Sequence, residues 1–240
     1  MKILIYDIES TPLLGYAWRP YDTNLISVLE DSRLLCFAYK WYGQKKTYFV
    51  KENVTEKLHE LFCEADVIVA HNNDKFDERK ANAAFLHAGL GPPEPYQTVD
   101  TLKVARKYFA STRSSLKELA REYGLTDKME NSGFGLWTGC MAGDKKSWKE
   151  MEKYNRQDVD TLEQLYTLIR PWMQTGHPNQ GFWQRGVTVC PTCGSKDLQA
   201  RGIRRTSVSE FQAFQCNSCG RYSRTRTRVP QHFGRGPRLT

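Results

Sequence analysis

Apolar residues along the first 170 positions of the chain fall into two kinds of pattern, short runs and helical spacings. The short runs are rich in β-branched and aromatic residues, which is typical of strands. They predict strands over residues 2–8, 34–42, 46–50, 66–70 and 98–99. Residues 54–65 instead carry apolar side chains every three to four positions, which predicts a helix. Capping residues and helix-ending glycines and prolines predict further helices over 78–88, 101–109 and 115–123, and a long helix from a cap at Ser147 to about Met173.

The order of these elements indicates an α/β fold. A three-residue turn joins the second and third strands as an antiparallel hairpin, and the helices between the later strands are typical of parallel crossovers. The glycine-rich stretch 129–145 is expected to be a loop, and the stretch 178–186 is expected to be a linker. The domain boundaries expected from this organisation are 1–175, a linker over 176–186, and 187–240.

The basic charge of the chain is concentrated at its C-terminal end. Residues 171–240 hold 11 Lys and Arg against two acids, whereas residues 1–170 hold 24 against 25, which gives net charges of +9 and −1. This distribution favours a polyanionic partner such as nucleic acid, although a merely soluble basic tail is the alternative. No apolar run approaches the roughly 20 residues of a membrane helix, and the first residues do not resemble a signal peptide. We therefore expect a cytoplasmic protein without a membrane partner.

Two carboxylates stand at the end of the first predicted strand. Asp7 and Glu9 are two residues apart, so a strand directs both side chains to one face. Two like charges about 4 Å apart repel by roughly 4 kcal/mol at an effective dielectric of about 20, and a divalent cation removes that cost. An exposed strand end explains this pair equally well when it is taken alone.

Two further groups of polar residues are also candidates for this metal site. Asp77 follows the strand 66–70 within a few residues, and a neighbouring strand end would bring it near the first pair. Tyr154 and Asp158 are four residues apart and share one face of the last helix. Asp158 borders the apolar stripe of that helix, where an unpaired carboxylate is disfavoured. Taken singly, a polar loop and ordinary core packing remain alternatives.

Together, and in this order, these residues resemble the motifs of the DEDD exonucleases of the ribonuclease H-like superfamily, which includes the DnaQ-like proofreading exonucleases. Asp7-Ile8-Glu9 resembles their first motif, Asn72 to Phe76-Asp77 the second, and Tyr154-x-x-x-Asp158 the third. The tyrosine marks the DEDDy branch. The resemblance covers about residues 1–172 and implies a mixed five-stranded ribonuclease H-like sheet with flanking helices. The chain departs from the pattern at Ser10-Thr11-Pro12, where DnaQ-like proofreaders usually have Thr-Gly.

The resemblance also implies a chemistry. Asp7, Glu9, Asp77 and Asp158 would hold two Mg²⁺ or Mn²⁺ ions about 3.5–4 Å apart, and the polarity of hydrolysis would be 3′→5′. Tyr154 would orient the attacking water, because a phenol with a pKa near about 10 is a poor general base at neutral pH. The residues expected to contact nucleic acid are Ser10, Thr11, Asn72 and Phe76.

Three other features near these motifs have more than one interpretation. Asp100 either assists in the site or caps the helix 101–109. His71 is expected to satisfy a strand end rather than bind metal. The stretch Gly135–Gly139 is either a substrate-contacting loop or an ordinary surface loop.

Four of the seven cysteines form two pairs near the C-terminus. Cys190 and Cys193, like Cys216 and Cys219, stand in a Cys-x-x-Cys-Gly pattern, in which a tight turn brings two thiolates to one ion. The spacing resembles a zinc ribbon with one structural Zn²⁺, and a redox pair is the alternative. The isolated Cys36, Cys63 and Cys140 are expected to be core thiols.

The segment after the last cysteine alternates basic and small residues. Tyr222, Arg224, Arg226 and Arg228 would share one face of a strand, with the arginines spanning about 13 Å at about 3.3 Å per residue. Such a stripe suits single-stranded nucleic acid, with arginines on phosphates and Tyr222 on a base. A charged edge strand that prevents aggregation is the alternative.

These patterns predict a 3′→5′ exonuclease acting on single-stranded nucleic acid, with DNA favoured over RNA and the ribbon assisting binding. A structure-selective endonuclease or an RNA-trimming nuclease on the same fold is one alternative. A non-catalytic nucleic-acid-binding recruitment protein is another, but four clustered carboxylates facing a polyanion argue against it.

Overall fold

The computed structural model describes residues 1–19, 21, 24–125, 132–174, 176–184 and 186–229. The chain divides into two compact units, Met1–Leu168 and Ile169–Thr240. The first unit contains the α/β sheet and the second contains the paired cysteines. Within the described residues, no helix has both the length and the apolar character needed to cross a lipid bilayer.

A mixed five-stranded sheet with the order β5-β4-β1-β6-β7 forms the centre of the first unit. Its strands are β1 (Ile3–Ser10), β4 (Leu34–Trp41), β5 (Tyr48–Val50), β6 (Val67–Ala70) and β7 (Gln97–Asp100). β4 pairs antiparallel with β1 and β5, whereas β6 pairs parallel with β1 and β7. The expected hairpin, the parallel crossovers and the ribonuclease H-like mixed sheet are therefore confirmed.

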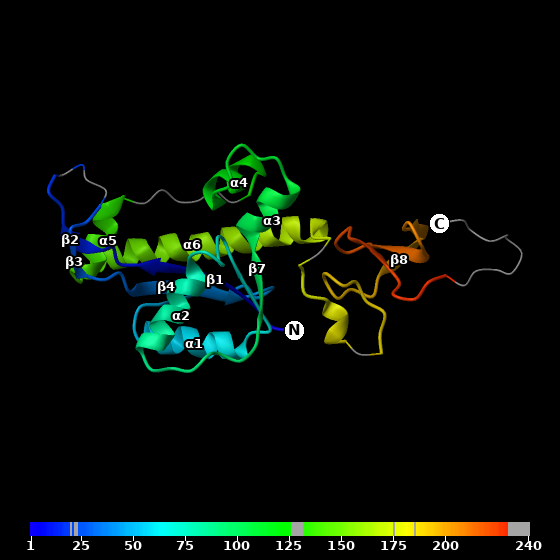
Figure 1. Cartoon of the computed structure of the whole chain (residues 1–240), viewed down its shortest axis with the longest axis horizontal. Coiled ribbons are helices and arrows are strands. Elements are labelled where there is room, and N and C mark those ends of the chain that lie inside the picture. Colours follow the sequence, from blue (N-terminus) through cyan, green and yellow to red (C-terminus); the bar gives the residue numbers. More distant parts are fainter. Residues whose placement is uncertain (20, 22–23, 126–131, 175, 185, 230–240) are drawn as a thin grey trace, which may run out of the picture. The chain divides into compact units, whose positions relative to one another are not determined.

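Helices cover both faces of this sheet (Figure 1). They are α1 (Val54–Glu64) and α2 (Asp77–His87) on one side, and α3 (Thr101–Tyr108), α4 (Leu116–Glu122), α5 (Phe134–Met141) and α6 (Lys145–Ile169) elsewhere on the unit. Tyr6 and Ile8 belong to the core cluster that includes Phe62 of α1 and Phe85 of α2. Asp7 points to the opposite face, where it contacts α6 through Asn155. The two-residue period of β1 thus separates an apolar face from the face that carries the acids.

Helix α5 occupies part of the stretch that was expected to be a loop. The expectation for 129–145 is wrong over residues 134–141, while residues 126–131 lie outside the described ones. Leu136 and Cys140, four residues apart, are buried and pack with Met151 of α6. A Cβ on Gly139 would lie 2.2 Å from the Ser147 hydroxyl oxygen. Glycine therefore allows close packing here instead of breaking the helix.

Both ends of α6 differ from the expectation. The helix begins at Lys145, and the Asp144 carboxylate accepts hydrogen bonds from the backbone N–H and the hydroxyl of Ser147, at 2.8 and 2.6 Å. Asp144 thus acts as the cap, and Ser147 lies in the first turn. The helix ends at Ile169 rather than near Met173, because Pro171 disfavours α-helical geometry in the residue before it and a 3₁₀ turn follows.

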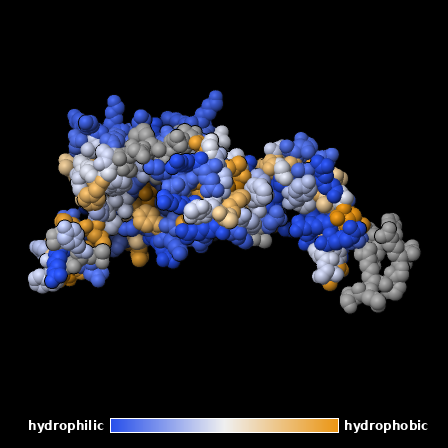
Figure 2. Space-filling view, turned by 90° about the horizontal axis from the view of Figure 1, so that it is seen from above, coloured by the Kyte–Doolittle hydropathy of each residue, from blue (hydrophilic) through white to orange (hydrophobic). Residues whose placement is uncertain are grey.

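A two-stranded antiparallel sheet, β2 (Leu14–Tyr16) and β3 (Ser27–Glu30), follows β1 and was not foreseen. Its apolar side chains are largely exposed, with Tyr16 at 61% and Leu29 at 52%. Figure 2 shows apolar residues among hydrophilic ones at the end of the first unit that carries these strands. Low burial on both strands explains why no amphipathic period marks them in the sequence.

The second unit contains a three-stranded antiparallel sheet with the order β10-β9-β8. Its strands are β8 (Leu198–Arg205), β9 (Glu210–Cys216) and β10 (Tyr222–Arg224). Part of the expected linker packs against the cysteine-bearing segment, because Gln180 N donates to Pro191 O at 2.8 Å and Gln184 Nε2 donates to Gly194 O at 3.3 Å. The domain boundaries drawn from the sequence stay a prediction.

Candidate active site and cysteine cluster

Three carboxylates meet where β1 faces α6. Oxygens of Asp7, Glu9 and Asp158 all lie within 4.8 Å of one another. Asp7 and Glu9 are half-buried and Asp158 is buried. The alternation of β1 supplies the first two acids to one face, and α6 supplies the third. Carboxylate oxygens this close together repel one another, and they form the donor set that hard divalent cations prefer.

Asp77 lies beside this group without belonging to the set of mutually close oxygens. Its Oδ1 accepts a hydrogen bond from the backbone N–H of Ile8 at 3.3 Å, so it reaches the backbone between Asp7 and Glu9. The side chain is 3% exposed. Burial raises the pKa of Asp77 to about 7, and the charge of Asp100 acts in the same direction against the backbone hydrogen bonds. An ionised Asp77 is therefore costly unless a cation is near.

Two polar side chains that the sequence reasoning did not assign hold the acids in place. Asn155 Nδ2 donates to Asp7 Oδ2 at 2.7 Å and to Asp7 O at 3.2 Å, and the residue is fully buried. Trp137 Nε1 donates to Glu9 Oε2 at 3.2 Å. The position of Asn155 inside the third motif was an available signal. For Trp137 the signal was only its place in the stretch Gly135–Gly139, because its contact with Glu9 depends on helix α5.

Tyr154 is buried, at 7% exposure, one helical turn before Asp158 on α6. It packs in a cluster with Cys36, Leu136, Cys140 and Met151. The ring of Trp137 meets it edge to face, with centroids 6.3 Å apart. Because Tyr154 precedes Asp158 by four residues on α6, both lie on one helix face. Tyr154 thus packs in the core and shares a helix face with Asp158.

Asp100 caps α3, as one of its two interpretations required. Its carboxylate accepts from the backbone N–H groups of Leu102 and Lys103. It also accepts from the N–H of Asn72 at 3.0 Å and of Asp74 at 3.3 Å. One carboxylate therefore holds both the start of α3 and the turn that leads to Asp77.

His71 satisfies the strand end, as expected. Its ring nitrogens lie 2.9 Å from Thr101 Oγ1 and 2.8 Å from Ser114 O. Asn72 adopts a left-handed backbone with φ of 70°, which asparagine tolerates. The turn after β6 is thus shaped by local hydrogen bonding, and His71 is engaged in the fold.

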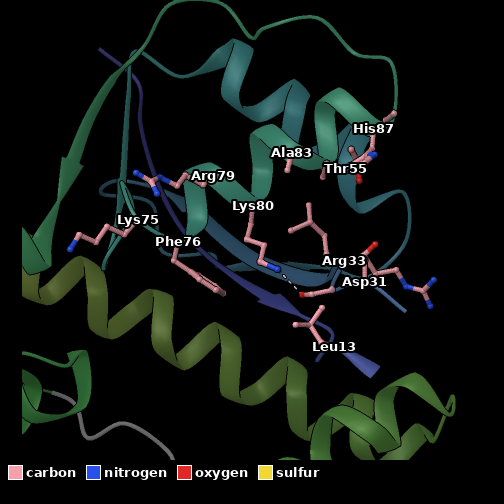
Figure 3. A pocket seen from close by; sticks show the side chains of 14 residues that line it. Leu13, Asp31, Arg33, Thr55, Lys75, Phe76, Arg79, Lys80, Ala83 and His87 are labelled. Atoms are coloured by element: carbon pink, nitrogen blue, oxygen red, sulfur yellow. Dashed lines mark hydrogen bonds between the residues drawn. The ribbon is translucent and has the colours of Figure 1, made fainter. Parts of the chain in front are cut away.

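The expected nucleic-acid contacts differ in how accessible they are. Thr11 is 4% exposed, and its hydroxyl accepts from the backbone N–H of Arg33 at 2.9 Å. That hydroxyl therefore ties the end of β1 to the residue before β4 and is unavailable to a ligand. Ser10 is half-buried, whereas Phe76 is 39% exposed at the edge of a pocket (Figure 3).

The four paired cysteines of the second unit converge. All four sulfur atoms lie within 4.8 Å of one another, with Cys190 and Cys219 at 3.7 Å and Cys193 and Cys216 at 3.6 Å. Tetrahedral zinc with Zn–S bonds of about 2.3 Å requires sulfur atoms about 3.8 Å apart. Burial raises the pKa of Cys193 to about 11 and also raises that of Cys219, whereas at Cys216 backbone hydrogen bonds outweigh burial and lower the pKa to about 7. Without a cation, gathering four thiolates here is therefore costly. This geometry fits a four-thiolate metal centre.

The basic segment after Cys219 is only partly a strand. β10 ends at Arg224, so the expectation that Arg226 and Arg228 continue the strand is wrong. Thr225 N donates to Gln212 O at 3.0 Å, but the regular pairing with β9 stops there. The guanidinium carbon of Arg224 lies 3.7 Å from the centroid of the Phe211 ring, and that of Arg226 lies 5.1 Å from Phe182. All three arginines and Tyr222 are exposed.

Known proteins resemble parts of this chain. Residues 4–170 match the model of the RNase_H superfamily. Protein NEN3 of Arabidopsis thaliana is 29% identical over 116 residues, which are 48% of this chain and 22% of that protein. The family B DNA polymerase from the hyperthermophilic archaeon Pyrobaculum calidifontis shares the fold with a TM-score of 0.53 at 16% identity, over 71% of this chain and 25% of the polymerase chain. The chain thus spans about a quarter of the length of either protein.

Proposed function

The chain belongs to the RNase_H superfamily, and from this membership and the geometry of its acids we propose that it is a metal-dependent 3′→5′ exonuclease of the DEDDy type. Its proposed substrate is single-stranded nucleic acid, with DNA favoured over RNA. The observation that carries the proposal is the convergence of Asp7, Glu9 and Asp158 within 4.8 Å. A purely binding protein gains nothing from such a cluster, because carboxylates repel a polyanion.

The proposed metal ligands are Asp7, Glu9, Asp77 and Asp158, which would hold two Mg²⁺ or Mn²⁺ ions. The fit rests on the all-oxygen donor set and on the cost of gathering these charges without a cation. When bound, the ions would supply a nucleophilic water and stabilise charge at the reacting phosphate. Asn155 and Trp137 would keep the Asp7 and Glu9 carboxylates in fixed orientations through the hydrogen bonds described above.

Tyr154 is proposed to orient the attacking water through its hydroxyl. Its buried ring, packed against Trp137 on the face of α6 that carries Asp158, would limit the movement of that hydroxyl. A phenol is protonated at neutral pH, so a hydrogen-bonding role suits it better than proton abstraction.

The second unit is proposed to be a zinc ribbon that assists substrate binding. The sulfur spacing supports one structural Zn²⁺, and in so small a module the metal would contribute much of the folding energy. Tyr222, Arg224, Arg226 and Arg228 are the proposed contacts to nucleic acid, since they are exposed and, within the described residues, form no ion pair with an acid. We retain 1–175, 176–186 and 187–240 as the proposed domain, linker and ribbon.

Hydrolysis of labelled oligonucleotides tests the proposal directly. The protein is incubated with 5′-labelled DNA or RNA and Mg²⁺ or Mn²⁺, and the products are separated by length. A ladder that shortens from the 3′ end supports the proposal, whereas internal cuts indicate an endonuclease. Asp158→Asn should abolish the ladder, while Glu152→Gln, at an exposed position on α6, should leave it unchanged. Equal activity of the two variants would remove Asp158 from the site.

A further inference from the structure

An open pocket of about 980 Å³ lies along α2 in the first unit (Figure 3). Helix α2 forms one side, and residues 31–34, which lead into β4, form another. Phe76, which immediately precedes Asp77, lines the pocket. Leu13, four residues after Glu9, also lines it. One end of the pocket, at Phe76, therefore adjoins the proposed metal ligand Asp77.

The charge of this pocket differs from that of the unit around it. One acid, Asp31, lines the pocket together with four basic residues. The basic residues are Arg33, Lys75, Arg79 and Lys80. Lys80 Nζ donates to the Ser32 hydroxyl at 2.6 Å, and in the described part of the chain none of the four forms an ion pair with an acid. Residues 1–170 have a net charge of −1, so this local excess of +3 is a concentration of uncompensated positive charge.

The basic side chains are spread along the pocket. In Figure 3, Lys75 and Arg79 lie towards one end, Arg33 lies at the other, and Lys80 points into the space between them. The middle of the helix contributes small side chains, Ala83 and Ala84, which leave the space beside α2 open. A linear polyanion fits such a row of charges better than a compact one does.

The length of the row sets the length of the ligand. Helix α2 has 11 residues, which corresponds to about 16 Å at about 1.5 Å per residue. Successive phosphates of one stacked strand rise by about 3.4 Å, so the pocket accommodates about five nucleotides or fewer. The side chains of Phe76 and Leu13, which are 39% and 53% exposed, offer apolar surface to unstacked bases. In a duplex the base faces are already stacked, so this feature favours a single strand.

We propose that this pocket, the α2 groove, binds the phosphates of the single strand that leads to the active site. The inference rests on the proposed function and deepens it, because it assigns substrate binding to the first unit itself and not to the second unit alone. Recognition through phosphates predicts binding that is independent of sequence and strongly dependent on salt.

The test is a salt titration of binding with a variant of the groove that has two fewer positive charges. Lys75→Gln/Arg79→Gln removes two exposed charges. Lys45→Gln/Lys46→Gln, in the β4–β5 turn, removes two charges at the far end of β4 from the groove and serves as the matched control. All proteins are full-length and carry Asp158→Asn, and the probe is a 5′-fluorescein-labelled hexathymidylate followed by anisotropy in Mg²⁺.

The groove variant should bind the probe about tenfold or more weakly at 50 mM salt, and its log–log salt slope should be shallower by about 1.4, or about 0.7 per lost phosphate contact. The control should match the parent protein. Coinciding slopes for the groove variant and the control would overturn the proposal. An equal loss of slope on a 12-base-pair duplex probe would overturn the assignment to a single strand.

Hydrolysis separates failure of the groove from failure of the proposed function. With Asp158 restored, the groove variant should raise KM for the hexamer by a larger factor than it lowers kcat, whereas the Lys45→Gln/Lys46→Gln control should leave both unchanged. If the parent protein hydrolyses the hexamer and the slopes coincide, the groove fails and the exonuclease stands. If the parent protein hydrolyses neither probe and the salt slope of the groove variant is still shallower than that of the control, the groove stands and the exonuclease fails.

Discussion

Replacing Asp77 by asparagine should stabilise the protein when no divalent ion is bound in the acid cluster, and the gain should grow with pH. Asp77 is 3% exposed and accepts a hydrogen bond from Ile8 N–H. Asparagine keeps the shape and the accepting oxygen but carries no charge. The variant therefore isolates the cost of ionising this buried carboxyl in the folded state.

The expected magnitude follows from the pKa of Asp77, which burial raises from 3.8 to about 7. Because the folded-state pKa is raised, the contribution of the protonated Asp77 carboxyl to the stability of the fold is fully present below about pH 4 and is lost as the pH rises through 7. Linkage with these two values gives a cost of about 2 kcal/mol at pH 5 and about 4 kcal/mol at pH 8. Asp77→Asn should recover about these amounts in the first unit.

Urea unfolding followed by tryptophan fluorescence at pH 5 and pH 8 measures this difference. The buffer contains neither Mg²⁺ nor Mn²⁺, and it contains no chelator, so that the proposed zinc at the four cysteines is retained. The two units are expected to unfold in separate steps, and the step of the second unit provides an internal reference. Glu52→Gln, which removes an exposed acid near the start of α1, is the control and should shift stability by less than about 0.5 kcal/mol.

The explanation by burial is refuted if Asp77→Asn gives no gain in the free energy of unfolding, or the same gain at pH 5 and at pH 8. Addition of millimolar Mn²⁺ at pH 8 supplies an independent check. Because a cation compensates the ionised carboxylate, Mn²⁺ should raise the melting temperature of the parent protein more than that of the variant. An equal rise for both proteins would remove Asp77 from the metal ligands.

Three further predictions follow from individual contacts. Trp137→Phe keeps an aromatic ring and loses the indole hydrogen bond to Glu9, so turnover should fall about tenfold with an unchanged circular dichroism spectrum. Full activity would show that Glu9 needs no such support. Tyr154→Phe should lower kcat by about one to three orders of magnitude while binding in an inactive background barely changes; parallel losses in both would indicate a packing role. Gly139→Ala should destabilise the first unit by about 1–3 kcal/mol in urea unfolding, because its Cβ would meet the Ser147 hydroxyl, and Ser147→Gly should restore stability; a stable single variant would contradict the close packing of α5 on α6.

The parts of the fold that were predicted correctly are those with a strong local pattern. The central strands and the helices α1, α2 and α6 follow from runs of apolar residues and from helical spacing, which local backbone geometry translates directly into buried faces. The strand β2 and its partner β3 were missed because their apolar side chains are exposed on both faces. Helix α5 was missed because its two glycines resemble loop residues until the close approach of Ser147 is known.

The candidate site shows the same division. The identity and order of the four acids, the tyrosine and the four cysteines are properties of the sequence, because the chemistry of each motif depends on residue types at short spacings. The hydrogen bond between Trp137 and Glu9 joins residues 128 positions apart, and that between Asn155 and Asp7 joins residues 148 apart. No local spacing encodes such contacts.

By itself, the sequence determined which side chains are candidates for the proposed chemistry and, through the two-residue period of β1, that Asp7 and Glu9 share a face. Only the tertiary structure decided that Asp158 meets them there and that Asp100 holds the turn before Asp77. It also decided that Arg33 joins Lys75, Arg79 and Lys80 along α2. The physical reason is that backbone periodicity acts over a few residues, whereas the packing of a sheet between helices brings distant segments together and buries their charges in a common environment.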